Sequence, residues 1–210
     1  MPLRSSTPIL WAQVLGIAFV QGAISLCWVI YSLYIPDMLT SAGWDEKMAV
    51  NLVMIENFLA AGVEPMLGGL SDRWQVWVGT RMPLITVGAI ASAGLFILLP
   101  LSLVVGGHNS GTWLVGLAVA WAIAMAVFRS PVVALLGSFA YGTGLAQAAS
   151  ILTLIGGLVS ASRALANQAI LGMGATAAFG IGSVVLIASV IVLRAWGGSA
   201  PFRGLGWAFC

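Results

Sequence analysis

The stretch Gly68 to Arg81, GGLSDRWQVWVGTR, decides the fold because charge, glycine and aromatic residues crowd together there between two long apolar segments. One apolar segment begins near Met48, and the chain returns to apolar sequence at Met82-Pro83. The pattern predicts a tight, basic loop that joins two transmembrane helices. This turn orients the rest of the chain.

The composition indicates that the surrounding solvent is lipid. Of the 210 residues, 60% are hydrophobic and 7% are charged, and the mean hydropathy is +1.06. Soluble globular proteins carry about 25% charged residues. The apolar runs reach the roughly 20 residues that a transmembrane helix needs, and no alternating pattern indicates a barrel. We therefore expect an all-α, polytopic membrane helical bundle.

Six transmembrane helices are expected to form one bundle over residues 1–194, followed by a short cytoplasmic tail over residues 195–210. The predicted spans are Pro8 to Ile35, Met48 to Leu70, Pro83 to Val105, Thr112 to Leu136, Leu145 to Ala161, and Ala166 to Leu193. The first is longer than the roughly 7 to 15 apolar residues of a signal peptide and is kept as a mature helix. The fifth is the weakest, because hydroxyl side chains dilute it and Gly156-Gly157 lowers its helix propensity.

Orientation follows from the Lys and Arg residues, because positively charged loops stay in the cytoplasm. With the N-terminus inside, six of the eight fall on or near the cytoplasmic side: Arg4, Arg73, Arg81, Arg129, Arg194 and Arg203. Lys47 and Arg163 fall outside. Both termini are then cytoplasmic, in an inner (cytoplasmic) or thylakoid membrane of bacterial type. Tryptophans near the expected surfaces, such as Trp44, Trp113 and Trp196, are interpreted as interfacial anchors.

Several function classes lack a sequence signature. There is no basic run for nucleic acid and no phosphate-binding G-x-x-x-x-G-K-[ST]. The single histidine, His108, has no cysteine or clustered carboxylate nearby, so we expect neither a metal site nor His-based catalysis. We expect no enzyme and no cofactor.

The turn resembles the loop between helices 2 and 3 of the major facilitator superfamily, G-x-L-S/A-D-R followed by a glycine and basic residues. Here Gly68-Gly69-Leu70-Ser71-Asp72-Arg73 precedes Gly79 and Arg81. Arg81-Met82-Pro83-Leu84-Ile85 is similar to the start of helix 3 in the sugar:cation symporter and bacteriochlorophyll-delivery branches. Phe128 to Leu136, FRSPVVALL, resembles the end of helix 4 there.

The resemblance implies the N-terminal six-helix half of a twelve-helix carrier, which holds its substrate between two halves near the membrane midplane. The chain departs from the family's pattern at Gly137 to Gly144, a loop that lacks the charged residues usual after helix 4. By analogy, Asp72 with Arg73 and Arg81 would form a conformational gate. The simpler interpretation makes these residues topology determinants and helix caps, while Gly68, Gly69 and Gly79 let the loop bend and pack.

Ionisable residues within spans need partners, because each costs about 2.5 to 3.5 kcal/mol near a helix centre on insertion scales. Glu64 and Arg129 both fall about 24 to 26 Å from the outer face at ~1.5 Å per residue. We predict that they form a buried ion pair, or that Arg129 is shared with Asp72. Glu56 has no basic residue at its level, which predicts either a proton or cation site or a neutral acid hydrogen-bonded to a neighbouring helix. Asn57 points about 100° away from it.

In helix 1 a polar stripe follows the spacing i, i+4, i+7, i+11 of one helical face: Gln21, Ser25, Trp28 and Ser32. In carriers of the resembling family, helices 1, 2, 4 and 5 surround the cavity. The resemblance therefore implies a substrate or ion pathway through Gln21, Trp28, Glu56, Asn57 and Arg129.

Two functions follow from these observations. The first is a half-size transporter for a small solute, completed by self-association or by a separate second half. The second is a non-transporting accessory or assembly subunit that is derived from this fold and docks on a larger membrane complex. The resemblance to the bacteriochlorophyll-delivery branch makes a photosynthetic complex one candidate and admits a bound pigment or lipid. Both predict membrane lipids and another membrane protein, or a second copy, as partners.

Overall fold

The computed structural model describes residues 10–45, 47–48, 50–56, 58, 62, 81–105, 110–140 and 143–197. The helices with described bounds are α1 (Trp11–Ser41), α3 (Met82–Val105), α4 (Ser110–Phe139), α5 (Thr143–Ala161), α6 (Arg163–Met173) and α7 (Ala175–Gly197). Residues 50–56 are also helical, and no strand occurs within the described ranges. The all-helical prediction is confirmed.

Five helices are long and apolar enough to cross a membrane, and they confirm that the chain is a helical membrane protein. These candidate spans are Trp11–Ser41, Met82–Val105, Ser110–Gly137, Gly144–Ala161 and Ala175–Trp196. Helix α6, with 11 residues, is too short to cross. The predicted second span falls largely outside the described residues, so the expected number of six stays a prediction.

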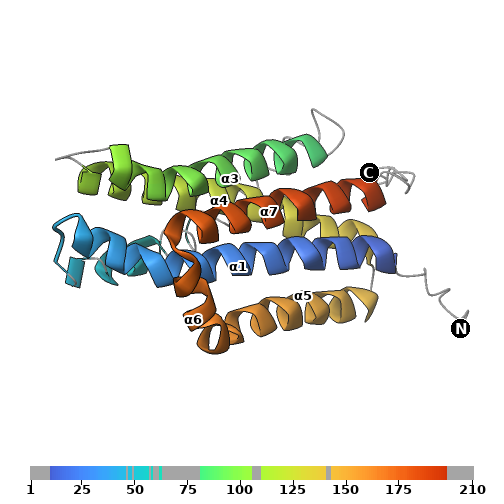
Figure 1. Ribbon diagram of the computed structural model, residues 1–210. Helices are drawn as coiled ribbons and strands as arrows, with labels where there is room; N and C mark the ends of the chain where they lie inside the picture. The colour runs from blue at the N-terminus through green and yellow to red at the C-terminus, as the bar shows by residue number, and fades with distance from the viewer. Residues whose placement is uncertain are drawn as a thin grey trace, which may run out of the picture.

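The long helices lie side by side, with α1 in the middle (Figure 1). Helix α1 packs against α7, α5 and α4, while α3 packs against α4 and α7. Helices α1, α3 and α5 run in one direction, whereas α4 and α7 run in the other (Figure 1). The end of α1 and the start of α3 therefore lie at opposite ends of the bundle (Figure 1).

Close helix crossings depend on glycine. A Cβ atom at Gly88 of α3 would lie 3.1 Å from Phe128 Cβ and 3.2 Å from Phe128 Cα of α4. At Gly16 of α1 it would lie 3.2 Å from Leu193 Cδ1 of α7. In lipid, where burial of apolar surface adds little drive, backbones gain contact by approaching at such small residues.

The last predicted span, Ala166 to Leu193, is wrong as a single helix. The chain breaks at Gly174, where φ is +81° and ψ is 154°, a conformation that essentially only glycine adopts. Helix α6 precedes the break and lies across α1, and α7 follows it (Figure 1). Helix α7 also continues to Gly197, slightly beyond the expected end.

Two hydrogen bonds tie α6 to α1. Pro36 lies inside α1 and has no N–H, so the Ser32 carbonyl loses its partner four residues on. The Arg163 side chain donates to that carbonyl, with Nη2 3.4 Å from the oxygen. Tyr34 donates its hydroxyl to the Ile170 carbonyl of α6 at 2.6 Å. Helix α1 continues through the proline to Ser41, beyond the predicted end at Ile35.

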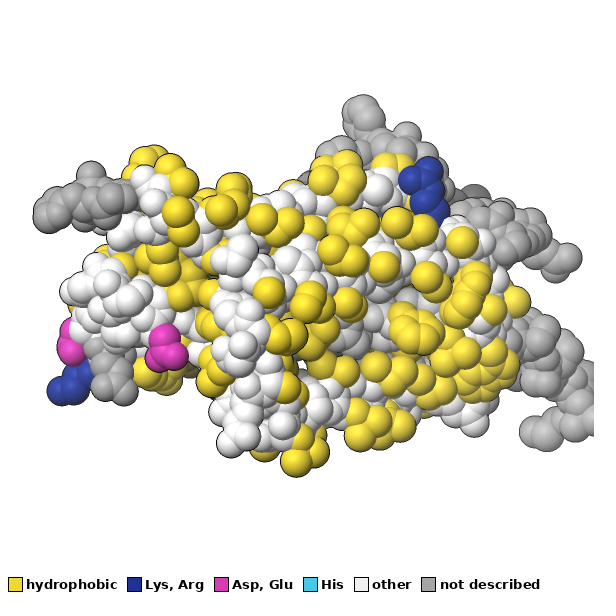
Figure 2. Space-filling view, viewed as in Figure 1, with side chains coloured by type: hydrophobic (Ala, Val, Ile, Leu, Met, Phe, Trp, Pro, Cys, Tyr) yellow, Lys and Arg dark blue, Asp and Glu magenta, His cyan; other side chains and the backbone are white. Residues whose placement is uncertain are grey.

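Five of the eight described charged side chains lie at the two ends of the bundle, and the other three are Glu56, Arg129 and Arg163. Asp37, Asp45 and Lys47 are exposed at the end where α1 finishes, while Arg81 precedes α3 and Arg194 lies in the last turn of α7 at the opposite end. Between the ends, the visible face is a band of hydrophobic side chains (Figure 2). This distribution is that of a membrane-embedded surface.

Candidate functional site: a polar cleft beside α5

A cleft of about 490 Å³ separates α4 from α5, and α1 forms its third wall. Its described lining residues are Gln21, Ser25, Arg129, Val133, Leu136, Ala149, Leu152, Thr153, Gly156, Gly157 and Ser160. Helix α5 packs along α1 but makes few contacts with α4, which leaves the space open. Volumes of this size are typical of sites for small molecules.

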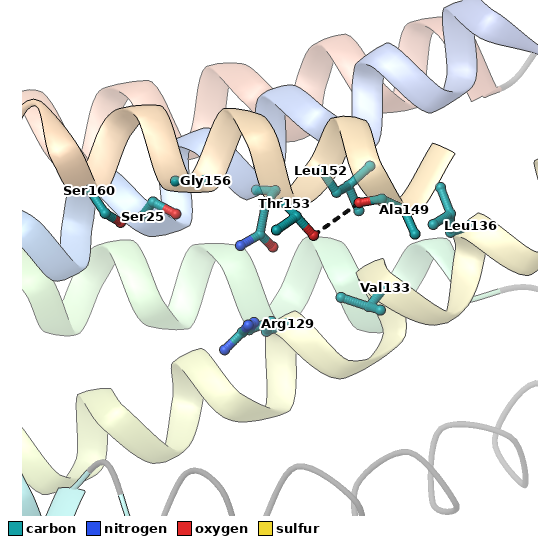
Figure 3. A pocket seen from close by; sticks show the side chains of 11 residues that line it. Ser25, Arg129, Val133, Leu136, Ala149, Leu152, Thr153, Gly156 and Ser160 are labelled. Atoms are coloured by element: carbon teal, nitrogen blue, oxygen red, sulfur yellow. Dashed lines mark hydrogen bonds between the residues drawn. The ribbon is translucent and has the colours of Figure 1, made fainter. Parts of the chain in front are cut away.

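The polar part of the cleft combines side chains from three helices. Gln21 and Ser25 of α1 are half-buried, and so is Arg129 of α4. Thr153 of α5 lies across the gap from Arg129, and its hydroxyl donates to the Ala149 carbonyl at 3.1 Å (Figure 3). Because the guanidinium is permanently charged, this part of the cleft holds a fixed positive group within a membrane helix.

Two adjacent glycines set the shape of the α5 wall. A Cβ at Gly156 would lie 3.2 Å from Ser25 Oγ and 3.4 Å from Gln21 Nε2, so the missing side chain lets α5 approach the polar face of α1. Gly157 has nothing within 4 Å of its Cβ position and lines the cleft. The pair thus has a packing role on one side and leaves open volume on the other.

The apolar part of the cleft lies toward the end of α4. Val133 and Leu136 follow Arg129 by one and two helical turns, and Leu152 faces them from α5. Leu136 and Leu152 are buried. The cleft therefore has a charged region and an apolar region about 6 to 10 Å apart along α4.

A cluster of aromatic rings fills the bundle farther along α1. Trp121 of α4 stacks on Tyr31, with ring centroids 4.5 Å apart, and on Phe96 at 5.0 Å. Trp28 packs against Trp121 at 4.9 Å and against Tyr31 at 5.6 Å. Trp28 is thus part of this cluster and is absent from the lining of the cleft.

The buried acid Glu56 is bonded to the same cluster. The Tyr31 hydroxyl donates to Glu56 Oε2 at 2.5 Å, and both side chains are fully buried. Glu56 Oε1 and the indole Nε1 of Trp121 have no hydrogen-bond partner among the described residues. The bond joins Glu56 to a neighbouring helix, and both interpretations, a proton or cation site and a neutral hydrogen-bonded acid, stay predictions.

The predicted pathway is therefore divided between two places. Gln21 and Arg129 meet in the cleft, whereas Trp28 and Glu56 lie at the aromatic cluster. Tyr31 is ten residues beyond Gln21 on α1, a separation of about 15 Å. Trp28, on the same face of α1 as Gln21, lies between the two.

Many predicted site residues lie outside the described ranges: Asn57, Glu64, Gly68, Gly69, Asp72, Arg73 and Gly79. The gate loop and the Glu64 to Arg129 ion pair therefore stay predictions. Arg81 is described and directly precedes α3. Within the described part of the chain, no group of three or more His, Cys, Asp or Glu side chains could hold a metal ion.

The α5 side of the cleft was not predicted from the sequence. Ala149, Thr153, Gly156 and Ser160 follow the spacing i, i+4, i+7, i+11, the same spacing that identified the stripe on helix 1. Applying that test to the fifth span would have found this wall. Tyr31 was also missed, because a tyrosine among apolar residues gives no sequence signal of its partner.

Comparison with protein-family models, curated proteins and solved structures finds no match. The resemblance to the major facilitator superfamily therefore rests on the sequence motifs alone.

Proposed function

We propose that the chain is one six-span half of a facilitator-type membrane transporter and that a small solute passes through the cleft between α1, α4 and α5. The observation that supports this most is the meeting of Gln21 and Arg129 in an open cleft of about 490 Å³. Charged side chains within membrane helices typically mark solute or ion pathways. A second copy or a separate chain supplies the other half.

The topology is consistent with this proposal. Because α1 and α3 run in the same direction (Figure 1), one more crossing by the chain between them would bring the five candidate spans to the six that the sequence motifs imply. The end that carries Arg81 and Arg194 is proposed to face the cytoplasm by the positive-inside rule. With Cys210 replaced by serine, Asp45→Cys in intact vesicles should react with an impermeant maleimide from outside, and Arg194→Cys only after lysis. The reverse pattern would contradict the orientation.

Uptake into proteoliposomes tests the cleft itself. A panel of labelled small organic solutes is supplied to vesicles that contain the native chain, Gly157→Leu or Gly116→Leu. Both glycines have open space at the Cβ position, but only Gly157 lines the cleft. We expect Gly157→Leu to abolish uptake and Gly116→Leu to retain it. Equal uptake by the two variants would exclude the cleft as the pathway.

The accessory-subunit alternative predicts a different partner. A carrier half should migrate after gentle solubilisation as a dimer or with a partner of similar size. Migration with a large respiratory or photosynthetic assembly, together with no uptake of any solute, would favour the alternative and would direct the search to a bound pigment or lipid.

A further inference from the structure

We propose that α5 and α6 form a hinged arm, and that the hydrogen bond between Arg163 and the Ser32 carbonyl is a latch that holds the arm in its observed position. The arm turns about Gly174, and its α5 part carries one wall of the cleft. This inference rests on the proposed function and gives the cleft a device that changes its width.

The junction between α5 and α6 is stiff. A single residue, Ser162, separates the two helices, and backbone hydrogen bonds continue across it. The Ser162 N–H donates to the Leu158 carbonyl at 2.9 Å, and the Ala166 N–H donates to the Ser162 carbonyl at 2.8 Å. A displacement of α6 is therefore transmitted to the end of α5, where Ser160 lines the cleft.

The junction between α6 and α7 is built differently. Gly174 has φ +81° and ψ 154°, and nothing lies within 4 Å of its Cβ position. The start of α7 is fixed, because Ala178 and Phe179 are fully buried, whereas α6 buries only Ile170. A glycine without close neighbours can change φ and ψ freely, so the chain can turn at this point with little loss of packing.

The latch lies at the end of α6 that is far from the hinge. Ile170, whose carbonyl accepts from Tyr34, is four residues before Gly174, while Arg163 is eleven residues before it. At about 1.5 Å per residue these positions are about 6 and 16 Å from the hinge, so a turn of the arm moves Arg163 farther. The Arg163 bond is long, at 3.4 Å, and its side chain is exposed. It is therefore the weaker tie and breaks first.

Pro36 provides the acceptor of the latch. Because proline has no N–H, the Ser32 carbonyl lacks its usual backbone donor four residues later in α1. The guanidinium of Arg163 supplies a donor that the helix itself does not. This acceptor is particular to one position on α1, and it defines where the arm docks.

Helix α5 has room to tilt. It is the least enclosed of the five candidate spans, with 22% of its span buried against 44 to 61% for the others. It crosses α1 at glycines: a Cβ at Gly22 would lie 3.1 Å from Ile155 Cγ2, and one at Gly156 would lie 3.2 Å from Ser25 Oγ. Toward α4 it borders the cleft. A tilt of α5 about this crossing changes its distance from α4 and so the width of the cleft.

Distances between spin labels, measured by double electron–electron resonance in nanodiscs, test the latch. Three exposed positions receive labels: Leu158→Cys of α5, Leu165→Cys of α6 and Val104→Cys of α3. The α5 and α6 labels are each paired with the α3 label, in a chain that also carries Cys27→Ala and Cys210→Ala. A chain with the native latch should give one main distance for each pair and a minor, shifted distance for the released arm.

We expect Arg163→Ala to raise the fraction of the shifted distance about three- to tenfold in both pairs, the effect of losing one exposed hydrogen bond. The matched control is Arg194→Ala, which removes the same charge from the last turn of α7 and should leave both distributions unchanged. Unchanged distributions in Arg163→Ala would overturn the inference. A shift at Leu165 without one at Leu158 would also overturn it, because the two helices would then not move as one arm.

If Arg163→Ala does not fold, Pro36→Ala decides. This substitution returns a backbone N–H to the Ser32 carbonyl and raises helix propensity, so it weakens the latch without weakening α1. We expect a rise in the shifted fraction like that of Arg163→Ala. Distributions identical to those with the native latch would overturn the role of this carbonyl and with it the latch.

The outcome is independent of solute uptake. A latch-dependent shift together with no uptake of any solute would support the arm and remove the transport function. Unchanged distances together with uptake that Gly157→Leu abolishes would remove the arm and leave the proposed function standing.

Discussion

Replacing Gly88 with alanine tests how α3 and α4 are held together. The new Cβ would lie 3.1 Å from Phe128 Cβ and 3.2 Å from Phe128 Cα, whereas carbon atoms prefer separations of about 3.5 to 4.0 Å. One of these neighbours is backbone of a packed helix and cannot rotate away. The helices must therefore separate by roughly half an ångström, which forfeits about a quarter of the dispersion energy of the contacts that open.

Overpacking of this kind costs about 1 to 3 kcal/mol. The folding equilibrium should then fall about 5- to 150-fold. Reversible unfolding in mixed micelles, titrated with dodecyl sulfate and followed by near-ultraviolet circular dichroism, measures this difference. The matched control is Gly94→Ala, in the same helix but with nothing within 4 Å of its Cβ position. Equal free energies of unfolding for the two variants would refute the close crossing at Gly88.

Two further predictions use the same unfolding assay. Tyr31→Phe removes the hydroxyl that donates to Glu56 and should lower the free energy of unfolding by about 1 to 3 kcal/mol, because the buried carboxyl group then loses its partner. Adding Glu56→Leu to this variant should restore part of that loss. Strictly additive effects of the two substitutions would contradict the hydrogen bond. Gly174→Ala should lower the free energy of unfolding by about 1 to 3 kcal/mol, because Gly174 has a positive φ. The control Gly172→Ala, in open space within α6, should be neutral or slightly stabilising. Similar free energies of unfolding for the two variants would contradict the break between α6 and α7.

Hydropathy predicted the membrane class and most of the helical segments, because the need to satisfy every backbone group in lipid leaves few alternatives. It failed at Gly174 because Ala166 to Leu193 is predominantly apolar and contains four glycines, and nothing in the local pattern distinguishes Gly174 from the others as a helix break. The break depends on contacts from elsewhere in the chain. Tyr34 and the carbonyl exposed by Pro36 hold α6 against α1, and these long-range partners are invisible in a local pattern.

For the candidate site, periodicity drew attention to one face of α1, and the rarity of arginine in membrane helices drew attention to α4. Together these signals identified Gln21 and Arg129, which the cleft brings together. Periodicity placed Trp28 on the same face as Gln21, yet its ring packs with Trp121. A shared helix face does not by itself predict that a residue lines the cleft when a large side chain has an aromatic partner nearby. The sequence likewise gave no indication that Tyr31 bonds Glu56.

Because α6 lies across α1 and does not extend α5 or α7, the helices of the bundle differ in length. At about 1.5 Å per residue, the 31 residues of α1 span about 46 Å, while the 19 of α5 and the 23 of α7 span about 28 and 34 Å. A hydrocarbon layer of about 30 Å matches the short flank, so the far end of α1 reaches into the headgroups. In a thicker bilayer the lipid beside α5 and α7 would have to thin locally, whereas the longer α1 would still span the hydrocarbon layer. The flank that contains α5, beside the cleft, is therefore the part of the protein most sensitive to acyl-chain length.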